Sequence, residues 1–432
     1  MPRKYSGPSQ KDLTAPRKRI ASRMTFFSRA LRVGILASAL MMLNCQQLMD
    51  LLDESNKTDT TTANTNTDLD KAGSWTVLVY LDAANNLEAA GIGDVGEMRT
   101  AATGTGYNGN TVYVMMDRMN GYATTNTLPA PLNTDFFGTY IFQVVTGTGA
   151  ISTAAFNTTV PNTGLPYWPT ANDGSTANAE TNMGHQKTLE NFLVWGLNKA
   201  KADGTDYVYL DIWDHGAGWG GGAYGGNAVA WDDDSGHDAL SIDEIRAAIS
   251  SAQSQTGKKI TIIGFDACYM GTIENAYSFK DYASIMIGSE EVEPGNGWAY
   301  DQWLPSGKVS PRTVATNVVT SFKNSYNGSG EQVTLAAYDL SKIDGFSTAL
   351  ESFLSKISTQ PAAAISAARL NSQSFNNDLS VDFYDFVDKM NMPESAAVKN
   401  MINSMMVSEA HTTGGKVNGS HGVTVFFPQS SS

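Results

Sequence analysis

One histidine and one cysteine, far apart in the sequence, each follow an apolar run that is typical of a buried strand. His215 comes after YVYLDIWD, and Cys268 comes after ITIIGFDA. In open α/β sheets, ligands bind at the edge where the carboxyl ends of the strands lie, so we expect these two side chains to share that edge. A neighbouring histidine stabilises a cysteine thiolate and protonates a leaving group, as attack on a peptide bond requires. The pair therefore favours nucleophilic catalysis by cysteine.

The residues around this pair allow both a functional and a purely structural interpretation. Gly216 lets the backbone approach closely, so its N–H and that of Cys268 could together hold a developing oxyanion. Taken alone, an apolar-flanked cysteine is more often an inert core residue, and a histidine at a strand end is often only hydrogen-bonded. The functional interpretation is preferred because both occur at comparable strand ends and the only other cysteine is Cys45.

The surrounding pattern alternates strands with helices. Buried strands are predicted at residues 75–81, 111–116, 207–213, 260–265 and 283–288, and helices at 87–102, 188–202, 242–252 and 270–278. Ser241 and Glu244 have the spacing of a capping box at the start of the third helix. Such alternation predicts an α/β fold with a mostly parallel sheet flanked by helices. Beyond about residue 305, helices surround single strands at 333–338 and 423–427, which predicts a smaller C-terminal α+β region packed on the sheet.

Composition limits the classes of partner. The chain has 432 residues, enough for about two or three domains, and a formal net charge of −14. Residues 1–44 hold nine of the basic side chains and one acid, which leaves 20 basic and 42 acidic residues in the remainder. Such an acidic body repels phosphate backbones, so we expect no nucleic-acid partner. Cationic peptides or divalent metals fit it better.

The N-terminal residues have the pattern of a targeting segment. Arg29 and Arg32 precede an apolar run at residues 33–43 that is too short to span a bilayer, and Cys45 follows it. This resembles a bacterial lipoprotein signal, which implies lipidation of Cys45 and a membrane-anchored protein outside the cytoplasm. An ordinary secretory signal or an uncleaved anchor is the alternative. We expect a signal at 1–45, a flexible tether at 46–72, a catalytic domain at 73–305 and the C-terminal region at 306–432.

Several motifs together resemble the caspase-like cysteine peptidases, and more closely the clostripain family. They are WTVLVYLDAANNLE, WDHGAGWGG, IIGFDACYMGTIENAY, SEEVEPGNGWAYDQWL and GVTVFFP, in the expected order between residues 75 and 428. The resemblance implies a caspase-like fold, with Cys268 as the nucleophile and His215 as base and acid of a catalytic dyad. It also implies that the substrates are peptides or proteins.

The resemblance extends to specificity. The acid two residues before the cysteine, here Asp266, would pair with an Arg or Lys side chain of the substrate at P1, the residue before the cleaved bond. Asn296 occupies a position where relatives often have a second acid, and Glu291 or Glu293 could compensate for it. We therefore expect an endopeptidase that cleaves after Arg or Lys. The alternatives are a neutral or acidic P1 preference, or an inactive surface binding protein on a peptidase scaffold.

An acidic run raises the question of a metal. Asp232, Asp233 and Asp234 are consecutive carboxylates that could bind calcium, on which some members of the resembled family depend. Their spacing does not match an EF-hand, so a solvated acidic loop is the preferred interpretation. We expect no required cofactor, with calcium as the one candidate ion.

Overall fold

The computed structural model describes residues 67–101, 107–119, 138–145, 167–168, 180–219 and 227–428. The expected signal, the tether up to residue 66 and Cys45 lie outside these residues. Among the described helices, none has the length and apolarity needed to cross a membrane.

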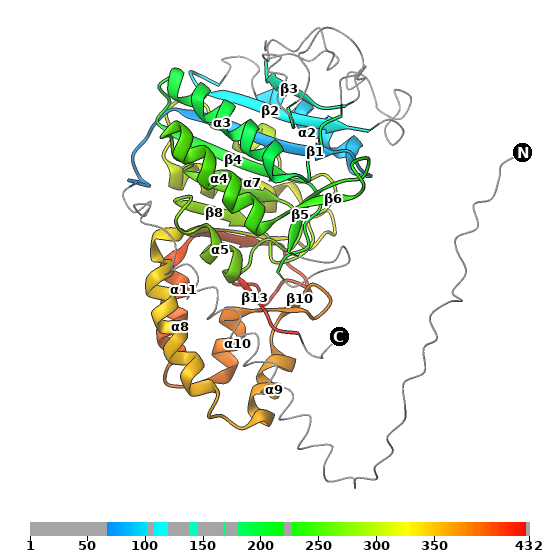
Figure 1. Cartoon of the computed structure of the whole chain (residues 1–432). Coiled ribbons are helices and arrows are strands. Elements are labelled where there is room, and N and C mark those ends of the chain that lie inside the picture. Colours follow the sequence, from blue (N-terminus) through cyan, green and yellow to red (C-terminus); the bar gives the residue numbers. More distant parts are fainter. Residues whose placement is uncertain are drawn as a thin grey trace, which may run out of the picture.

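One central sheet of eight strands organises the molecule (Figure 1). Its strands are β1 (Trp75–Ala83), β2 (Thr111–Arg118), β3 (Tyr140–Gln143), β4 (Tyr207–Trp213), β7 (Ile262–Asp266), β8 (Ile285–Gly288), β9 (Thr334–Asp339) and β12 (Met406–His411). The spatial order is β12-β9-β8-β7-β4-β1-β2-β3. The five strands from β8 to β2 in this order are parallel to one another, and β3, β9 and β12 are antiparallel additions at the edges. The predicted mostly parallel sheet is confirmed.

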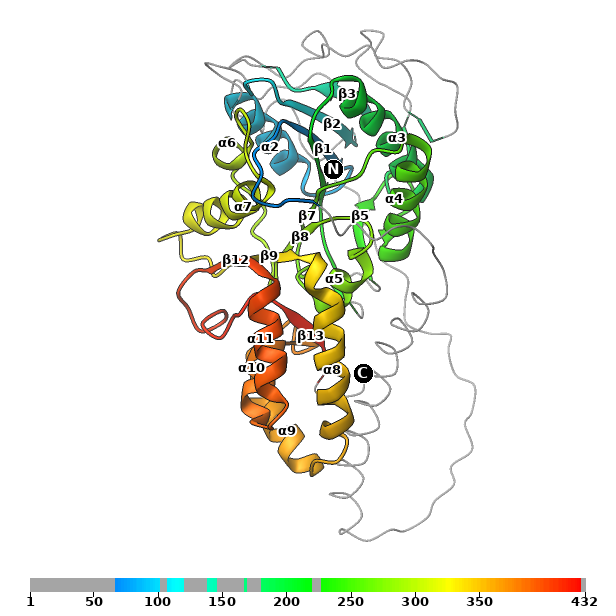
Figure 2. The ribbon, with the colours of Figure 1, turned by 90° about the vertical axis from the view of Figure 1, so that its left-hand side faces the viewer.

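Helices cover both faces of this sheet (Figures 1 and 2). One face packs against α3 (Gln186–Ala202), α4 (Ile242–Thr256) and α5 (Ile273–Phe279), and the other against α2 (Glu88–Ala101), α6 (Tyr300–Trp303) and α7 (Pro311–Ser325). Because side chains alternate along a strand, Leu78 and Tyr80 of β1 belong to the core on the first face, and Val77 and Val79 to the core on the second. Strands buried on both faces explain the continuous apolar runs in the sequence.

The C-terminal part is continuous with the sheet and also extends beyond it. Residues after 305 supply β9 and β12 to the main sheet. The helices α8 (Ile343–Ile357), α9 (Ala362–Asn371), α10 (Phe383–Met390) and α11 (Ser395–Met405) form a separate layer at one end (Figure 2). A small sheet of β10 (Ser374–Phe375), β11 (Ser380–Asp382) and β13 (Thr424–Phe426) joins this layer to the rest. Thr424 of β13 pairs with Thr272, just before α5, so the last strand contacts the first helix after Cys268.

Local signals in the sequence agree with the structure in most places. At the start of α4, Ser241 accepts a hydrogen bond from the N–H of Glu244, whose carboxylate accepts one from the N–H of Ser241, as the capping box requires. The hairpin of β5 (Ala228–Asp232) and β6 (Asp238–Ser241) was not predicted, because it lies in a stretch that reads as a glycine-rich loop. Strand β12 was also missed, because its residues are only half-buried and it is an edge strand.

Candidate active site

The predicted neighbourhood of His215 and Cys268 is confirmed. Strands β4 and β7 are adjacent and parallel, with Trp213 opposite Asp266, and the N–H of Asp214 donates to the carbonyl of Asp266 at 3.2 Å. The residues that follow each strand therefore emerge side by side at the carboxyl edge. His215 and Cys268 line the same cavity, whose volume is ≈ 310 Å³.

Gly216 brings the backbone of the histidine loop against the backbone of Cys268. A Cβ atom at position 216 would lie 2.2 Å from the carbonyl oxygen of Cys268 and 2.9 Å from its nitrogen, so only glycine fits. The backbone of the histidine loop therefore lies directly against that of Cys268, and the nearby N–H of Gly216 acts to lower the pKa of the thiol.

The sulfur is half-buried beside a loop that follows β8. The backbone N–H of Glu293 donates to Cys268 Sγ at 3.3 Å, and the thiol lies 3.8 Å from the Glu293 carbonyl. Burial raises the pKa of the Cys268 thiol, although the N–H groups of Glu293 and Gly216 counteract the rise. Burial also lowers the pKa of His215. Both shifts favour the uncharged forms, so the resting pair is a thiol and a neutral imidazole.

Asn86, which was not predicted as a site residue, holds the imidazole. His215 Nε2 and Asn86 Oδ1 are 3.0 Å apart. The preceding Asn85 is buried, and its side-chain amide donates to Asp214 Oδ1 at 2.8 Å and to the carbonyl of Trp231 at 2.9 Å. Both asparagines lie in the motif that follows β1, so the sequence signal was their doublet immediately after a strand end. This loop therefore holds both Asp214 and His215 of the histidine loop.

A pair of carboxylates lies at the cavity. Asp266 is buried, and its Oδ2 accepts a hydrogen bond from the N–H of Trp298 at 3.1 Å and lies 3.0 Å from the hydroxyl oxygen of Tyr300. Both Glu293 carboxylate oxygens are buried, and neither accepts a well-aligned hydrogen bond from a described donor. Burial raises the pKa of Asp266 to about 6, and burial together with the charge of Asp266 raises that of Glu293 well above its ordinary value. Asn296 is exposed and does not line the cavity.

Further acids lie behind this pair on the same face of the sheet. The hydroxyl of Tyr300 donates to Asp211 Oδ2 at 2.6 Å, and Trp213 Nε1 donates to Asp94 Oδ2 at 2.7 Å. Burial raises the pKa of both carboxyl groups, and the charge of Asp266 adds to each rise. Burial also raises the pKa of Glu97, to about 7. Burial therefore holds the acids behind Asp266 toward their neutral, protonated form.

The C-terminal region supplies another wall of the cavity. Asn376 and Asn377 line it, and with Asp378 they form a turn of three consecutive residues with left-handed φ angles of 52°, 52° and 67°. Asn376 Nδ2 donates to the carbonyl of Ala217 at 3.3 Å, which ties this turn to the histidine loop. Asparagine and aspartate tolerate this backbone conformation. The run Asn-Asn-Asp was the sequence signal for the turn, but nothing in the sequence indicated which site it would reach.

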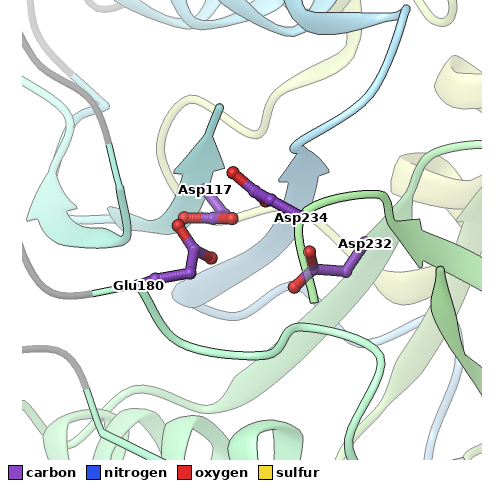
Figure 3. A group of neighbouring side chains, drawn as sticks. All are labelled: Asp117, Glu180, Asp232 and Asp234. Atoms are coloured by element: carbon purple, nitrogen blue, oxygen red, sulfur yellow. The ribbon is translucent and has the colours of Figure 1, made fainter. Parts of the chain in front are cut away.

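The acidic run divides. Asp233 Oδ1 lies 2.7 Å from Nδ1 of His237. Asp232 and Asp234 instead lie close to the carboxylates of Asp117 and Glu180, on the face of the sheet opposite to Asp266 (Figure 3).

Comparisons with known proteins agree with this architecture. A family model described as the clostripain family matches residues 79–430. The sequence is 24% identical to clostripain from Hathewaya histolytica over 422 residues, which covers 82% of this chain and 74% of that protein.

Two solved structures share the fold. An inactive zymogen of a C11 protease from Parabacteroides distasonis has a TM-score of 0.58 and 19% identity, over 83% of this chain and 93% of that one. A secreted C11 cysteine protease from Bacteroides thetaiotaomicron, in complex with an irreversible peptide inhibitor, has a TM-score of 0.54 and 19% identity, over 82% and 92%. The caspase-like fold class predicted from the sequence is confirmed by these matches.

Proposed function

Since this chain belongs to the clostripain family of cysteine peptidases, we propose that it is an endopeptidase with a dyad of Cys268 and His215, and that it cleaves after Arg or Lys. The observation that carries the proposal is the single cavity that holds the imidazole, the thiol and the Asp266 carboxylate.

The geometry supports a defined route for the protons. With Asn86 Oδ1 accepting a hydrogen bond from Nε2–H of His215, the neutral imidazole has its lone pair on Nδ1. The thiol proton passes to that nitrogen as the sulfur attacks the scissile carbonyl carbon. The N–H groups of Gly216 and Cys268 then hold the negatively charged oxygen. His215 returns the proton to the departing amine, and a thioester to Cys268 remains.

Hydrolysis of the thioester completes the cycle. His215 takes a proton from a water molecule, whose oxygen attacks the thioester carbonyl. Collapse of the second tetrahedral intermediate releases the carboxylic acid, and the proton returns to the sulfur.

The carboxylates support the preference for a basic P1 residue. A guanidinium entering the cavity would meet Asp266 together with Glu293, whose carboxylate oxygens accept no well-aligned hydrogen bond from a described donor. Charge-assisted hydrogen bonds to a carboxylate are about twice as strong as neutral ones. Glu293 thereby supplies the second acid that the exposed Asn296 does not.

We further propose that the enzyme acts outside the cytoplasm, attached to a membrane through a lipid on Cys45. This rests on the N-terminal sequence. Labelling of cells with an alkyne fatty acid should mark the wild-type protein and not Cys45→Ser, and equal labelling of both would contradict the anchor.

A panel of fluorogenic peptides that differ only at P1 tests the enzymatic proposal. We expect fast turnover with Arg and Lys, much slower turnover with citrulline, and none with Asn or Asp. Cys268→Ala and His215→Ala should each abolish it, whereas His411→Ala, a histidine on edge strand β12, should not. Repeating the assay with added calcium and with EDTA distinguishes an enzyme that lacks a required ion from a protein without activity. Preferential cleavage after a neutral or acidic residue would refute the basic specificity, and no turnover of any peptide by the folded protein would favour a binding function.

A further inference from the structure

The cavity at Cys268 is walled from both faces of the sheet. The Asp266 side chain lies on the face that packs against α2 and α6, with its Oδ2 3.0 Å from the hydroxyl oxygen of Tyr300. The turn of Asn376 and Asn377 connects β10 to β11, and the small sheet to which it belongs packs with α5 on the other face (Figure 1). Because Cys268 follows β7 at the edge between these faces, the cavity has two ends.

The two ends differ in charge. At the first, which we call the acidic end, the cavity is lined by Asp266 and Glu293. At the second, which we call the asparagine end, it is lined by Tyr269, Asn376 and Asn377. Burial raises the pKa of the Tyr269 hydroxyl, so this ring stays neutral. The asparagine end therefore offers a ring and amide groups without a charge.

Asn377 is free to bind a ligand, and its backbone is held in place. It is exposed, and no described group forms a hydrogen bond with its side-chain amide, whereas the neighbouring Asn376 is buried and bonded to the carbonyl of Ala217. From behind, the buried Arg369 donates through Nη2 to the carbonyl of Asp378 at 2.8 Å. A free amide on a fixed backbone loses little conformational freedom when it binds.

The direction of the substrate follows from the chemistry of the cleaved bond. A substrate poised for attack has its P1 side chain at Asp266 and its scissile carbonyl carbon at Cys268. The P1 Cα and the leaving nitrogen are bonded to different sides of that carbon. A chain whose P1 side chain fills the acidic end therefore continues, after the cleaved bond, away from that end. The asparagine end is the part of the cavity that lies in this direction.

We propose that the asparagine end binds the substrate segment that follows the cleaved bond, and that the Asn377 amide hydrogen-bonds to its main chain. The side-chain amide has both donors and an acceptor, which match the N–H and C=O groups of a peptide. The ligand class is an extended peptide without charge at these positions. Asn376 is a positioning residue, because it ties the turn to the histidine loop. The inference rests on the proposed peptidase function.

Two substrates with the same residues up to a P1 arginine test this inference. The short one ends in an aminocoumarin and has no residue after the cleaved bond, whereas the extended one is an internally quenched peptide that continues with several uncharged residues. The measured quantity is the ratio of kcat/KM for the extended substrate to that for the short one. Asn377→Gly keeps the left-handed backbone and removes the amide. It should lower the ratio by about 2- to 12-fold, as the loss of one hydrogen bond implies.

Asp378→Gly is the matched control. It makes the same substitution in the same turn, at a left-handed φ of 67°, but its side chain does not line the cavity. The ratio should stay within about twofold of the wild-type value, as for other exposed positions. Both substrates are measured on the same protein sample, so partial misfolding lowers the two values alike and leaves the ratio intact.

A dipeptide amide added during turnover of the short substrate gives a second measurement. Its amine competes with water for the thioester: the nitrogen bonds to the acyl carbon, the carbon–sulfur bond breaks, and the amine proton reaches the Cys268 sulfur through His215. The dipeptide has to bind where the leaving segment was. Asn377→Gly should therefore lower the yield of peptide transfer relative to hydrolysis by about 2- to 12-fold.

Three results would overturn the inference alone, with normal turnover of the short substrate by the wild-type protein. They are an unchanged ratio in Asn377→Gly, an equal fall of the ratio in Asp378→Gly, and an equal loss on both substrates in Asn377→Gly. The last result would place Asn377 beside the residues that precede the cleaved bond. No turnover of either substrate by the folded wild-type protein would overturn the peptidase function and this inference together.

Discussion

Replacing Asp266 by asparagine tests the specificity pocket with the smallest change of shape. The variant keeps an oxygen that can accept the hydrogen bond from the N–H of Trp298 beside the Tyr300 hydroxyl, but it removes the negative charge. A hydrogen bond to a charged group contributes about 1.5–3 kcal/mol, and removing one partner of a buried charge pair costs about 2–5 kcal/mol. Glu293 remains and can take over part of the ion pair, so we expect a loss of about 2–3 kcal/mol.

The assay is kcat/KM for two peptides that differ only at P1, one with arginine and one with its uncharged analogue citrulline. At about 1.4 kcal/mol per tenfold, the arginine peptide should lose roughly 30- to 150-fold. The citrulline peptide should change by less than about threefold, because the dyad is untouched. Asn296→Asp is the control, because it adds a negative charge near the cavity but not in it. Its kcat/KM for each peptide should stay within about threefold of the wild-type value, since Asn296 is exposed and outside the cavity.

An equal loss on both peptides would refute this reasoning, because it would mean that Asp266 supports the fold of the cavity and does not recognise charge. Full activity on the arginine peptide would refute it equally. Thermal unfolding of the variant separates these outcomes from simple misfolding. Asp266 lies among other buried acids, so its neutralisation should leave Tm unchanged or raised.

Three further predictions concern the same cavity. The ratio of kcat/KM for the arginine and citrulline peptides should fall as pH drops through about 6, because protonation of Asp266 removes the attractive charge; a pH-independent ratio would contradict this. Gly216→Ala should lower kcat by more than about 100-fold in a folded protein, because its Cβ would collide with the backbone of Cys268; wild-type kcat would contradict the assigned oxyanion donor. Asn86→Ala should lower kcat by roughly 2- to 12-fold with little change in KM, since one neutral hydrogen bond to His215 is lost, and Asn86→Asp should recover part of it; an effect on KM alone would argue against positioning.

The sequence was sufficient to predict the sheet and the position of its reactive edge. Runs such as YVYLDIW are almost entirely apolar, because strands β1, β4 and β7 are buried on both faces. Such a run can be recognised in a single sequence. His215 follows the end of β4 and Cys268 follows the end of β7, so the rule for parallel sheets predicted that they lie at the same edge. Both inferences depend on local patterns and on one general rule about parallel sheets.

The residues that were missed are brought to the site by contacts between distant segments. Asn377 reaches the cavity from a turn beyond α9, and Asp117 and Glu180 meet Asp232 only because the carboxyl ends of β2 and β5 converge. A single polar residue in a loop carries no sign of which partner it will meet. For the same reason the acidic run was interpreted from its own spacing, although two of its three members lie with carboxylates from elsewhere in the chain.

The wall built by Asn376 and Asn377, and the pairing of Thr424 with Thr272, have a consequence for biosynthesis. A nascent chain that ends anywhere before this turn has its thiol and imidazole but an open cleft. Contacts between such distant segments form late in folding. We therefore expect the cleft to close only after the carboxyl-terminal segment has folded onto the sheet, so that an incomplete chain lacks a finished substrate cavity.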